Sequence, residues 1–244
     1  TTVTPTNTTV TPTNTTVTPT VDPMTSRPRR AFTVTAACDD DREKPCIISI
    51  ISTQDGHKLV MVDNNNFKVK VVDMRHPHTV SASLTLNETP YRLALLPDGT
   101  FALTAGSCVI YLLTVTDNVT VTSRIKTGIK YWGVVGLSDG TLVVCCRRDD
   151  NKGVARVDVV RRSGDVVRTI IDTNTLTQLD RLNFLCLLDN HLFVSDYGSH
   201  AVYKVDISNG QVVDTLNHPE MKSPLQVTVD RSGHVYIASN AGHC

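Results

Sequence analysis

Residues 92–125, RLALLPDGTFALTAGSCVIYLLTVTDNVTVTSRI, decide the fold of this protein. Four short apolar runs in this stretch are separated by turn residues, and they predict strands over 92–97, 101–105, 108–115 and 119–125. Asp98-Gly99 separates the first two runs, and such a pair supplies the positive φ angles that a two-residue hairpin turn requires. No ten-residue stretch of the body has the apolar spacing of a capped helix, so we expect an all-β fold.

The same turn recurs at regular intervals along the chain. The second residues of the recurring pairs are separated by 43, 41, 50 and 43 residues, and the pairs are Asp55-Gly56, Asp98-Gly99, Asp139-Gly140, Asp189-Asn190 and Ser232-Gly233. A four-stranded unit of about 40–45 residues is the size of one β-propeller blade. A doubly wound α/β sheet is excluded because no crossover helix is predicted, and an immunoglobulin-like sandwich does not repeat this regularly.

Three regions follow one another in the 244-residue chain. Residues 1–21 repeat TTVTPTN with a proline in every seventh position, which predicts a disordered or extended tail. Residues 22–46 form a charged linker, for which we expect a solvated segment. Residues 47–244 form the propeller, and their length accommodates about four and a half blades, so we expect an incomplete, open ring.

The composition of the chain excludes several classes of function. The 24 Lys and Arg balance the 24 Asp and Glu, which excludes a globally basic nucleic-acid binder. No apolar stretch approaches the roughly 20 residues of a membrane helix, so no membrane partner is expected. The seven cysteines lack C-x-x-C spacing, so neither a zinc ribbon nor another metal site is predicted, and no cofactor is expected.

The last two periods resemble a known repeat. Residues 190–206, NHLFVSDYGSHAVYKVD, and 224–243, PLQVTVDRSGHVYIASNAGH, are similar to the NHL repeat, whereas the earlier periods keep only the strand alternation and the turn. The departures are Gln226 in place of the usual glycine and Asn240 in place of the usual aspartate. The resemblance implies a structural, hydrogen-bonding role for Asp196, His200 and His243.

A Thr/Pro-rich segment followed by NHL-type blades also resembles the C-terminal region of tripartite-motif proteins. This resemblance implies a non-catalytic propeller that binds a protein partner or substrate, as the substrate-recognition part of an E3 ubiquitin ligase, in the cytoplasm. Any oligomerisation would then come from segments outside this chain. Two alternatives stay open: an NHL propeller that binds single-stranded RNA in post-transcriptional regulation, and a secreted propeller on a mucin-like stalk.

The predicted loops suggest where a partner binds. In a propeller the connections between blades gather on one face with those between second and third strands, and we call this the loop face. Aromatic and basic residues there suit stacking and contact with charged groups. The candidate binding residues are Tyr91, Arg92, Lys130, Tyr131, Trp132, Arg147, Arg148, Arg181, Asn183, Tyr197 and Gln226.

No catalytic residue is predicted. The sequence has no G-x-S-x-G, H-E-x-x-H, Walker or dinucleotide-binding motif. The expected innermost strands (47–53, 92–97, 132–137, 183–188 and 225–229) contain no histidine that could hold a metal in the channel. The resemblance implies that any ligase activity belongs to the parent protein.

Overall fold

The computed structural model describes residues 35–76, 79–230 and 232–239. The predicted Thr/Pro tail of residues 1–21, most of the predicted linker and the motif residue His243 lie outside this part. Every regular element in the described part is a β-strand, as the sequence predicts. It holds no helix with the length and apolar character needed to cross a membrane.

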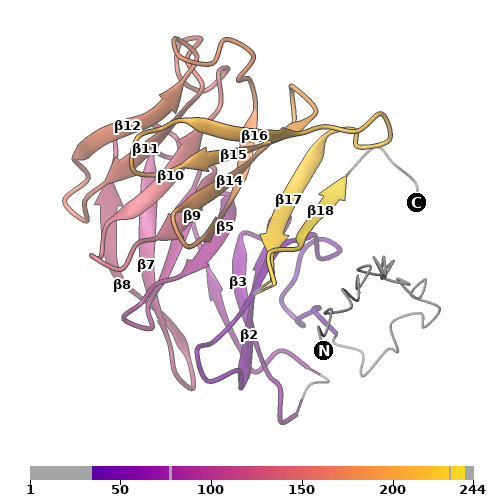
Figure 1. Cartoon of the computed structure of the whole chain (residues 1–244). Coiled ribbons are helices and arrows are strands. Elements are labelled where there is room, and N and C mark those ends of the chain that lie inside the picture. Colours follow the sequence, from indigo (N-terminus) through magenta and orange to yellow (C-terminus); the bar gives the residue numbers. More distant parts are fainter. Residues whose placement is uncertain (1–34, 77–78, 231, 240–244) are drawn as a thin grey trace, which may run out of the picture. The chain divides into compact units, whose positions relative to one another are not determined.

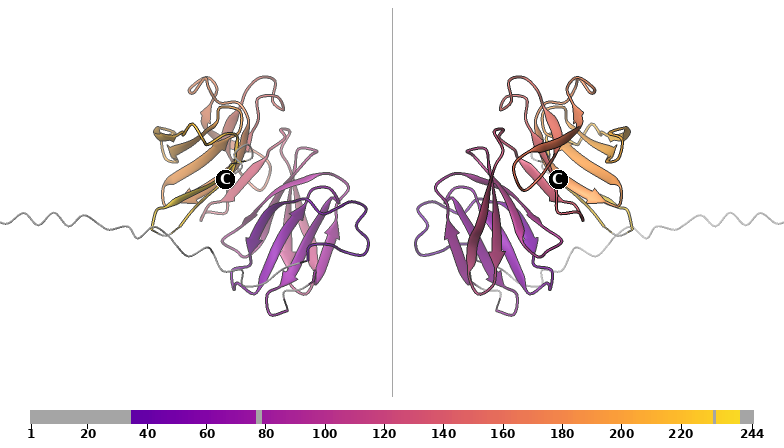
Figure 2. Two further views of the ribbon diagram at one scale, coloured as in Figure 1. Left: turned by 90° about the vertical axis from the view of Figure 1, so that its right-hand side faces the viewer. Right: turned by 90° about the vertical axis from the view of Figure 1, so that its left-hand side faces the viewer.

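The strands form five sheets that follow one another in chain order (Figures 1 and 2). Four sheets have four antiparallel strands each, paired in sequence order. The first consists of β1 (Ile47–Ser52), β2 (Lys58–Asp63), β3 (Lys68–Asp73) and β4 (Ala82–Thr85). The second consists of β5 (Pro90–Leu95), β6 (Phe101–Ala105), β7 (Val109–Val115) and β8 (Val119–Lys126).

The third sheet consists of β9 (Gly133–Gly136), β10 (Leu142–Cys146), β11 (Arg156–Val160) and β12 (Val166–Asp172). The fourth consists of β13 (Leu182–Leu188), β14 (His191–Asp196), β15 (Ala201–Asp206) and β16 (Val212–Leu216). The fifth has two described strands, β17 (Pro224–Val229) and β18 (Val235–Ser239). The expected four and a half blades are therefore present.

The first strand of every sheet faces a common channel. A cavity of about 370 Å³ is lined by residues of all five first strands, among them Ile51, Leu93, Val134, Leu185 and Val227. Sheets whose first strands surround one cavity are arrayed radially. The fold is thus a β-propeller with β1, β5, β9, β13 and β17 innermost.

The hydrophobic core lies between neighbouring blades. Separate clusters of buried side chains join the first blade to the second, the second to the third, the third to the fourth, and the fourth to β17–β18. Alternating strands direct every second side chain to each face of a sheet, so a blade between two others is apolar on both faces. This explains why β6 and β10 are buried along their whole length.

The recurring turns lie where the sequence places them, between the first and second strands of each blade. Gly56, Gly99, Gly140 and Gly233 have φ angles of 70°, 80°, 83° and 85°. The expected two-residue hairpin is nevertheless formed by Asp189-Asn190 alone among the described blades, where Asp189 has a φ of 52°. In the other four, the glycine N–H donates to the carbonyl oxygen three residues earlier, as in Gly56 to Thr53 at 2.9 Å, so the glycine closes a longer turn.

The longer third period also has a structural reason. Residues 147–155 connect β10 to β11, and residues 173–181 connect β12 to β13. These are the longest connections between described strands, and both lie at the same end of the propeller. The additional residues of the third period therefore enlarge its loops and leave the strands at ordinary blade length.

Gly133 allows the third and fourth blades to approach each other at the channel. A Cβ added there would lie 2.8 Å from Cys145 Sγ, 3.1 Å from Leu185 Cγ and 3.2 Å from the Asn183 carbonyl oxygen. We expect Gly133→Ala to lower the free energy of unfolding by about 1–3 kcal/mol, because overpacking forces neighbouring atoms apart. Urea unfolding followed by circular dichroism measures the change.

Gly106→Ala is the matched control. The nearest atom to its added Cβ is Tyr91 Oη at 3.6 Å, an ordinary contact, so this variant is expected to keep the stability of the wild type. Equal unfolding midpoints for both variants would show that the close approach at Gly133 is not needed.

Candidate functional site

The loop face follows from the strand order. Because successive strands are antiparallel, the connections between second and third strands lie at the same end as those between blades. In the described part the loop face consists of residues 64–67, 86–89, 106–108, 127–132, 147–155, 173–181, 197–200 and 217–223. Most of the predicted binding residues come from these connections or from the strand ends beside them.

Trp132 is enclosed between two other predicted residues. Its ring stacks on Tyr91 with centroids 4.0 Å apart, and the guanidinium carbon of Arg147 lies 3.2 Å from its centroid. Groups this close cannot share one side of the ring, so they cover both faces. Asp150 fixes the arrangement, since its carboxylate accepts from Trp132 Nε1 at 2.6 Å and from Lys130 Nζ at 3.0 Å.

A second group lies at the mouth of the channel. Arg92 on β5 donates to the Ile48 carbonyl oxygen on β1 at 2.9 Å and to Asn183 Oδ1 on β13 at 3.4 Å. A side chain that reaches two other innermost strands from a third must cross the channel. Arg147 donates to the same Asn183 Oδ1 at 3.1 Å, so the two guanidinium groups share one acceptor.

The other basic candidate residues of the loop face, Lys130, Arg148 and Arg181, have acidic partners. Ion pairs join Lys130 to Asp150, Arg148 to Asp180 and Arg181 to Asp149, at 3.0, 3.9 and 3.8 Å. Within the described part of the chain, Arg92 and Arg147 have no carboxylate within 4.0 Å. Their Nε atoms are both buried without a hydrogen-bond partner, as is the Nε atom of Arg148.

Burial acts on both of these cations. Arg92 is only 7% exposed, and burial together with the nearby charge of Arg147 lowers the pKa of Arg92 to about 10. Burial also lowers the pKa of Arg147, while Asp149 acts in the opposite direction. Both groups therefore stay charged at neutral pH, with no carboxylate in direct contact within the described part of the chain.

Tyr131 lies in the 127–132 connection of the loop face, but its side chain is buried in the core, which corrects its inclusion among the candidate binding residues. Its side chain is 2% exposed, and its hydroxyl donates to Asp158 Oδ2 at 2.7 Å inside the third blade. Burial, followed by the charge of Asp158, raises the pKa of the Tyr131 phenol. Neighbouring residues of an extended chain point in opposite directions, so Tyr131 faces the core and Trp132 the loop face.

The remaining candidate binding residues lie either in the loops or in the channel. Arg148 donates through Nη2 to the carbonyl oxygens of Thr177 and Leu179, at 2.8 and 2.7 Å. Tyr197 is partly buried beside Arg181, whose carbonyl oxygen accepts from its N–H at 3.0 Å. Gln226 lines the channel. The structure thus brings the side chains of all candidates except the buried Tyr131 to the loop face or the channel.

The two described motif residues stabilise turns. Asp196 is buried, and its carboxylate accepts backbone N–H groups from Asp180, Arg181, Gly198 and Ser199 at 2.8–3.3 Å. His200 Nδ1 accepts from the Ser223 N–H at 3.0 Å and so connects the fourth blade to the segment that enters the fifth.

A backbone feature at His200 recurs in blades where the sequence motif is absent. His200 has a φ of 58°, and the residue before the third strand has a similar φ in the first and second blades, 55° at Phe67 and 58° at Cys108. The equivalence of these three positions is not visible in the sequence, because three different side chains occupy them. The turn geometry is therefore more regular than its sequence.

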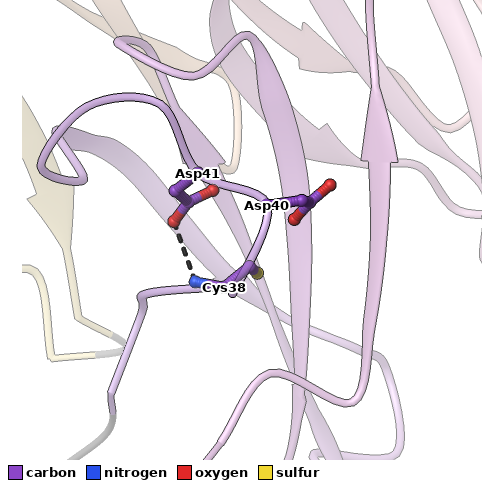
Figure 3. Close-up of side chains that lie close together, drawn as sticks. All are labelled: Cys38, Asp40 and Asp41. Atoms are coloured by element: carbon purple, nitrogen blue, oxygen red, sulfur yellow. Dashed lines mark hydrogen bonds between the residues drawn. The ribbon is translucent and has the colours of Figure 1, made fainter.

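A group of metal-type ligands lies outside the loop-face candidates, at Cys38, Asp40 and Asp41 (Figure 3). Its carboxylates are already paired: Lys68 Nζ lies 2.6 Å from Asp40 and 2.9 Å from Asp41, and Lys70 Nζ lies 2.5 Å from Asp41. Lys70 is fully buried and also pairs with Asp63. We therefore interpret the group as part of a buried ion network. Residues 22–46 were expected to be a solvated linker, but the side chain of Asp41 is buried in this network.

Comparisons with known proteins identify the fold. No protein-family model and no curated protein matches the sequence. A chain of a nidogen/laminin complex has a TM-score of 0.64 at 17% identity, over 80% of this chain and 72% of that chain. Hydrazine synthase of Kuenenia stuttgartiensis has a TM-score of 0.62 at 20% identity, over 82% of this chain and 57% of that chain.

A streptogramin B lyase is also similar, with a TM-score of 0.58 at 15% identity over 79% of this chain and 62% of that chain. This chain thus spans less than two thirds of the lyase and of the hydrazine synthase chain. Identities this low establish a shared β-propeller fold. The protein is therefore a β-propeller whose candidate site is the loop face.

The buried ion network makes stability depend on pH. Burial alone would raise the pKa of Asp41, but hydrogen bonds from Lys70 and from the Cys38 N–H outweigh it and lower the pKa from 3.8 to about 2. Asp41→Asn is expected to lower the free energy of unfolding by about 1–3 kcal/mol at pH 7. The difference from the wild type should shrink as the pH falls from 4 to 2, because Asp41 itself then becomes neutral.

Unfolding at a series of pH values measures this difference, and Asp40→Asn serves as its control. The Asp40 side chain is 70% exposed, so its removal is expected to change stability by less than about 1 kcal/mol. A difference for Asp41→Asn that stays constant from pH 7 to pH 2 would contradict the proposed network.

Proposed function

We propose that this propeller is a non-catalytic binding module whose loop face recognises a protein partner. In the finer form of the proposal, it selects the substrate of a tripartite-motif-like ubiquitin ligase in the cytoplasm, which rests on the sequence resemblance. A similar propeller chain occurs in a nidogen/laminin complex, which is an assembly of two proteins.

The observation that carries the proposal is the rigid attachment of the two longest loops to each other. Arg148 in residues 147–155 donates through its backbone N–H to the Asp180 carbonyl oxygen at 2.8 Å and through its side chain to Thr177 and Leu179. Loops that are ordered before binding lose less conformational entropy when a partner docks. The enlarged loops of the third period therefore form a preorganised surface.

The exposed part of this surface carries both signs of charge. Arg181 and Asp149, whose side chains are 49% and 56% exposed, lie beside Arg148 and Asp180. Mixed charges of this kind are typical of the polar rim of a protein interface, where they set orientation and specificity.

The alternative of RNA binding loses its main support. Stacking on bases needs an aromatic ring with a free face, but both faces of Trp132 are covered, and Tyr91 is buried against it. Among the predicted binding residues, the basic Arg148 and Arg181 are paired with carboxylates. The loop face thus fits a partner with charges of both signs better than a polyanion.

A photo-crosslinking amino acid in place of Arg181 tests the proposal. Because Arg181 is exposed and only loosely paired, its replacement should leave the fold intact. Irradiation of cells that express the chain is expected to give discrete protein adducts that resist ribonuclease. The same amino acid in place of Arg162, which lies on the opposite face beside Asp98, is the control and should not give these adducts.

Identical adducts from both positions, or adducts removed by ribonuclease, would contradict protein binding by the loop face. The ligase role has its own test: ubiquitination of the crosslinked protein should fall when Arg181→Glu is introduced at the natural locus. Unchanged ubiquitination would leave a binding module without that role. Mass spectrometry that finds glycans on the exposed Asn87 and Asn118 of native protein would replace the cytoplasmic location with a secreted one.

A further inference from the structure

The two cations at the channel mouth lack a counter-charge. Lys130, Arg148 and Arg181 each have an acidic partner in the loop face, whereas Arg92 and Arg147 have none within 4.0 Å in the described part of the chain. An ion that is removed from water without a partner is strongly destabilising. The cation–π contacts of Arg147 with Trp132 and of Arg92 with Phe184 compensate only a part of this penalty.

The arrangement of these groups resembles a receptor for an anion. Both guanidinium groups donate to Asn183 Oδ1, which holds them on one side of a single amide, while both Nε atoms keep unused, buried donors. A guanidinium presents its donors in a fork that matches the two oxygens of a carboxylate. Arg147 comes from a loop and is partly exposed, so it connects the buried Arg92 to the surface.

We propose that Arg92 and Arg147 form a binding site for a carboxylate, supplied by an aspartate or glutamate side chain of the protein partner. The inference deepens the proposed function and rests on it, since it names the chemical group that the loop face recognises. A carboxylate at the channel mouth would neutralise the two unpaired cations and satisfy their free donors. The negative charge of the ligand would be recognised by two cations that have no carboxylate within 4.0 Å in the described part of the chain.

A carboxylate fits this site better than a nucleic-acid phosphate. Access to the site is restricted, because Arg92 is 7% exposed and Arg147 packs on the ring of Trp132, which stacks on Tyr91. A phosphodiester within a strand carries bulky sugars on two sides, and the aromatic rings beside the site, Tyr91 and Trp132, are already stacked on each other. An acidic side chain ends in a flat, unsubstituted group that can enter such a site.

The single tryptophan of the chain reports directly on the site, since Trp132 touches Arg147. The full chain is titrated with N-acetyl-glutamate amide at constant ionic strength, and the neutral N-acetyl-glutamine amide is the matched probe. We expect a saturable change in Trp132 fluorescence with the acidic probe only, together with a higher thermal unfolding midpoint. Equal responses to both probes would overturn the proposal.

Two variants locate the binding. Arg147→Gln should weaken binding of the acidic probe at least tenfold. Binding is measured here as the increase in thermal unfolding midpoint, because this variant also changes the surroundings of Trp132 and hence its fluorescence. Arg162→Gln, on the opposite face, should keep the shift unchanged, and circular dichroism verifies that both variants fold. Full binding by Arg147→Gln, or tighter binding of dimethyl phosphate than of the acidic probe, would refute the carboxylate site.

The two proposals fail separately. Crosslinked partners at Arg181 without any response to the acidic probe would leave the protein-binding function in place and remove the carboxylate site. A specific response to the probe without crosslinked partners would keep the site and overturn the protein-binding function.

Discussion

The Asn183 side chain is the point on which the channel end of this propeller depends. Its amide is fully buried, accepts from Arg92 and Arg147, and donates to the Leu225 carbonyl oxygen at 3.4 Å. Arg92 extends the network to Ile48. Four innermost strands and the loop that follows β10 thus each contribute one residue, and because buried polar groups need partners, the positions of all five blades are coupled at this end.

This coupling gives the loop face its rigidity. The hydrophobic clusters join only neighbouring blades, so they fix the position of each blade relative to the next. Small deviations in these positions can still add up between blades that are not neighbours. A hydrogen-bonded group that crosses the channel limits these deviations where the loops converge. The stack of Tyr91, Trp132 and Arg147 continues the same constraint outward, from β5 to the loop that follows β10.

Local sequence signals were enough to predict the blades. Turn pairs such as Asp98-Gly99 specify their φ angles through neighbouring residues alone, and the apolar runs between them specify strands. Contacts between side chains that are distant in the sequence could not be predicted from these local signals. The pairing of Trp132 with Arg147 and the burial of Asp41 beside Lys68 and Lys70 both involve residues from other segments.

Some of the contacts that were not predicted do have a recognisable pattern in the sequence. Lys68 and Lys70 occupy alternate positions of one strand, so they project to the same face, and the acidic run at residues 39–41 offered them partners. Tyr131 and Trp132 are adjacent, so strand alternation alone assigns one of them to the core. No comparable signal connects Arg92, Arg147 and Asn183, because they lie on three blades and meet only after the ring has formed.

The charge at the channel mouth has a physical meaning beyond stability. Replacement of a buried ionic group by apolar side chains of similar volume is often neutral or stabilising, so the fold itself does not require cations at Arg92 and Arg147. Asn183 could be satisfied by neutral donors of the same geometry. What two unneutralised guanidinium groups add is a strong, localised positive potential in surroundings of low polarity, where charges interact more strongly than in water. Such a potential distinguishes between ligands by their charge, which is the property that a selective interface requires.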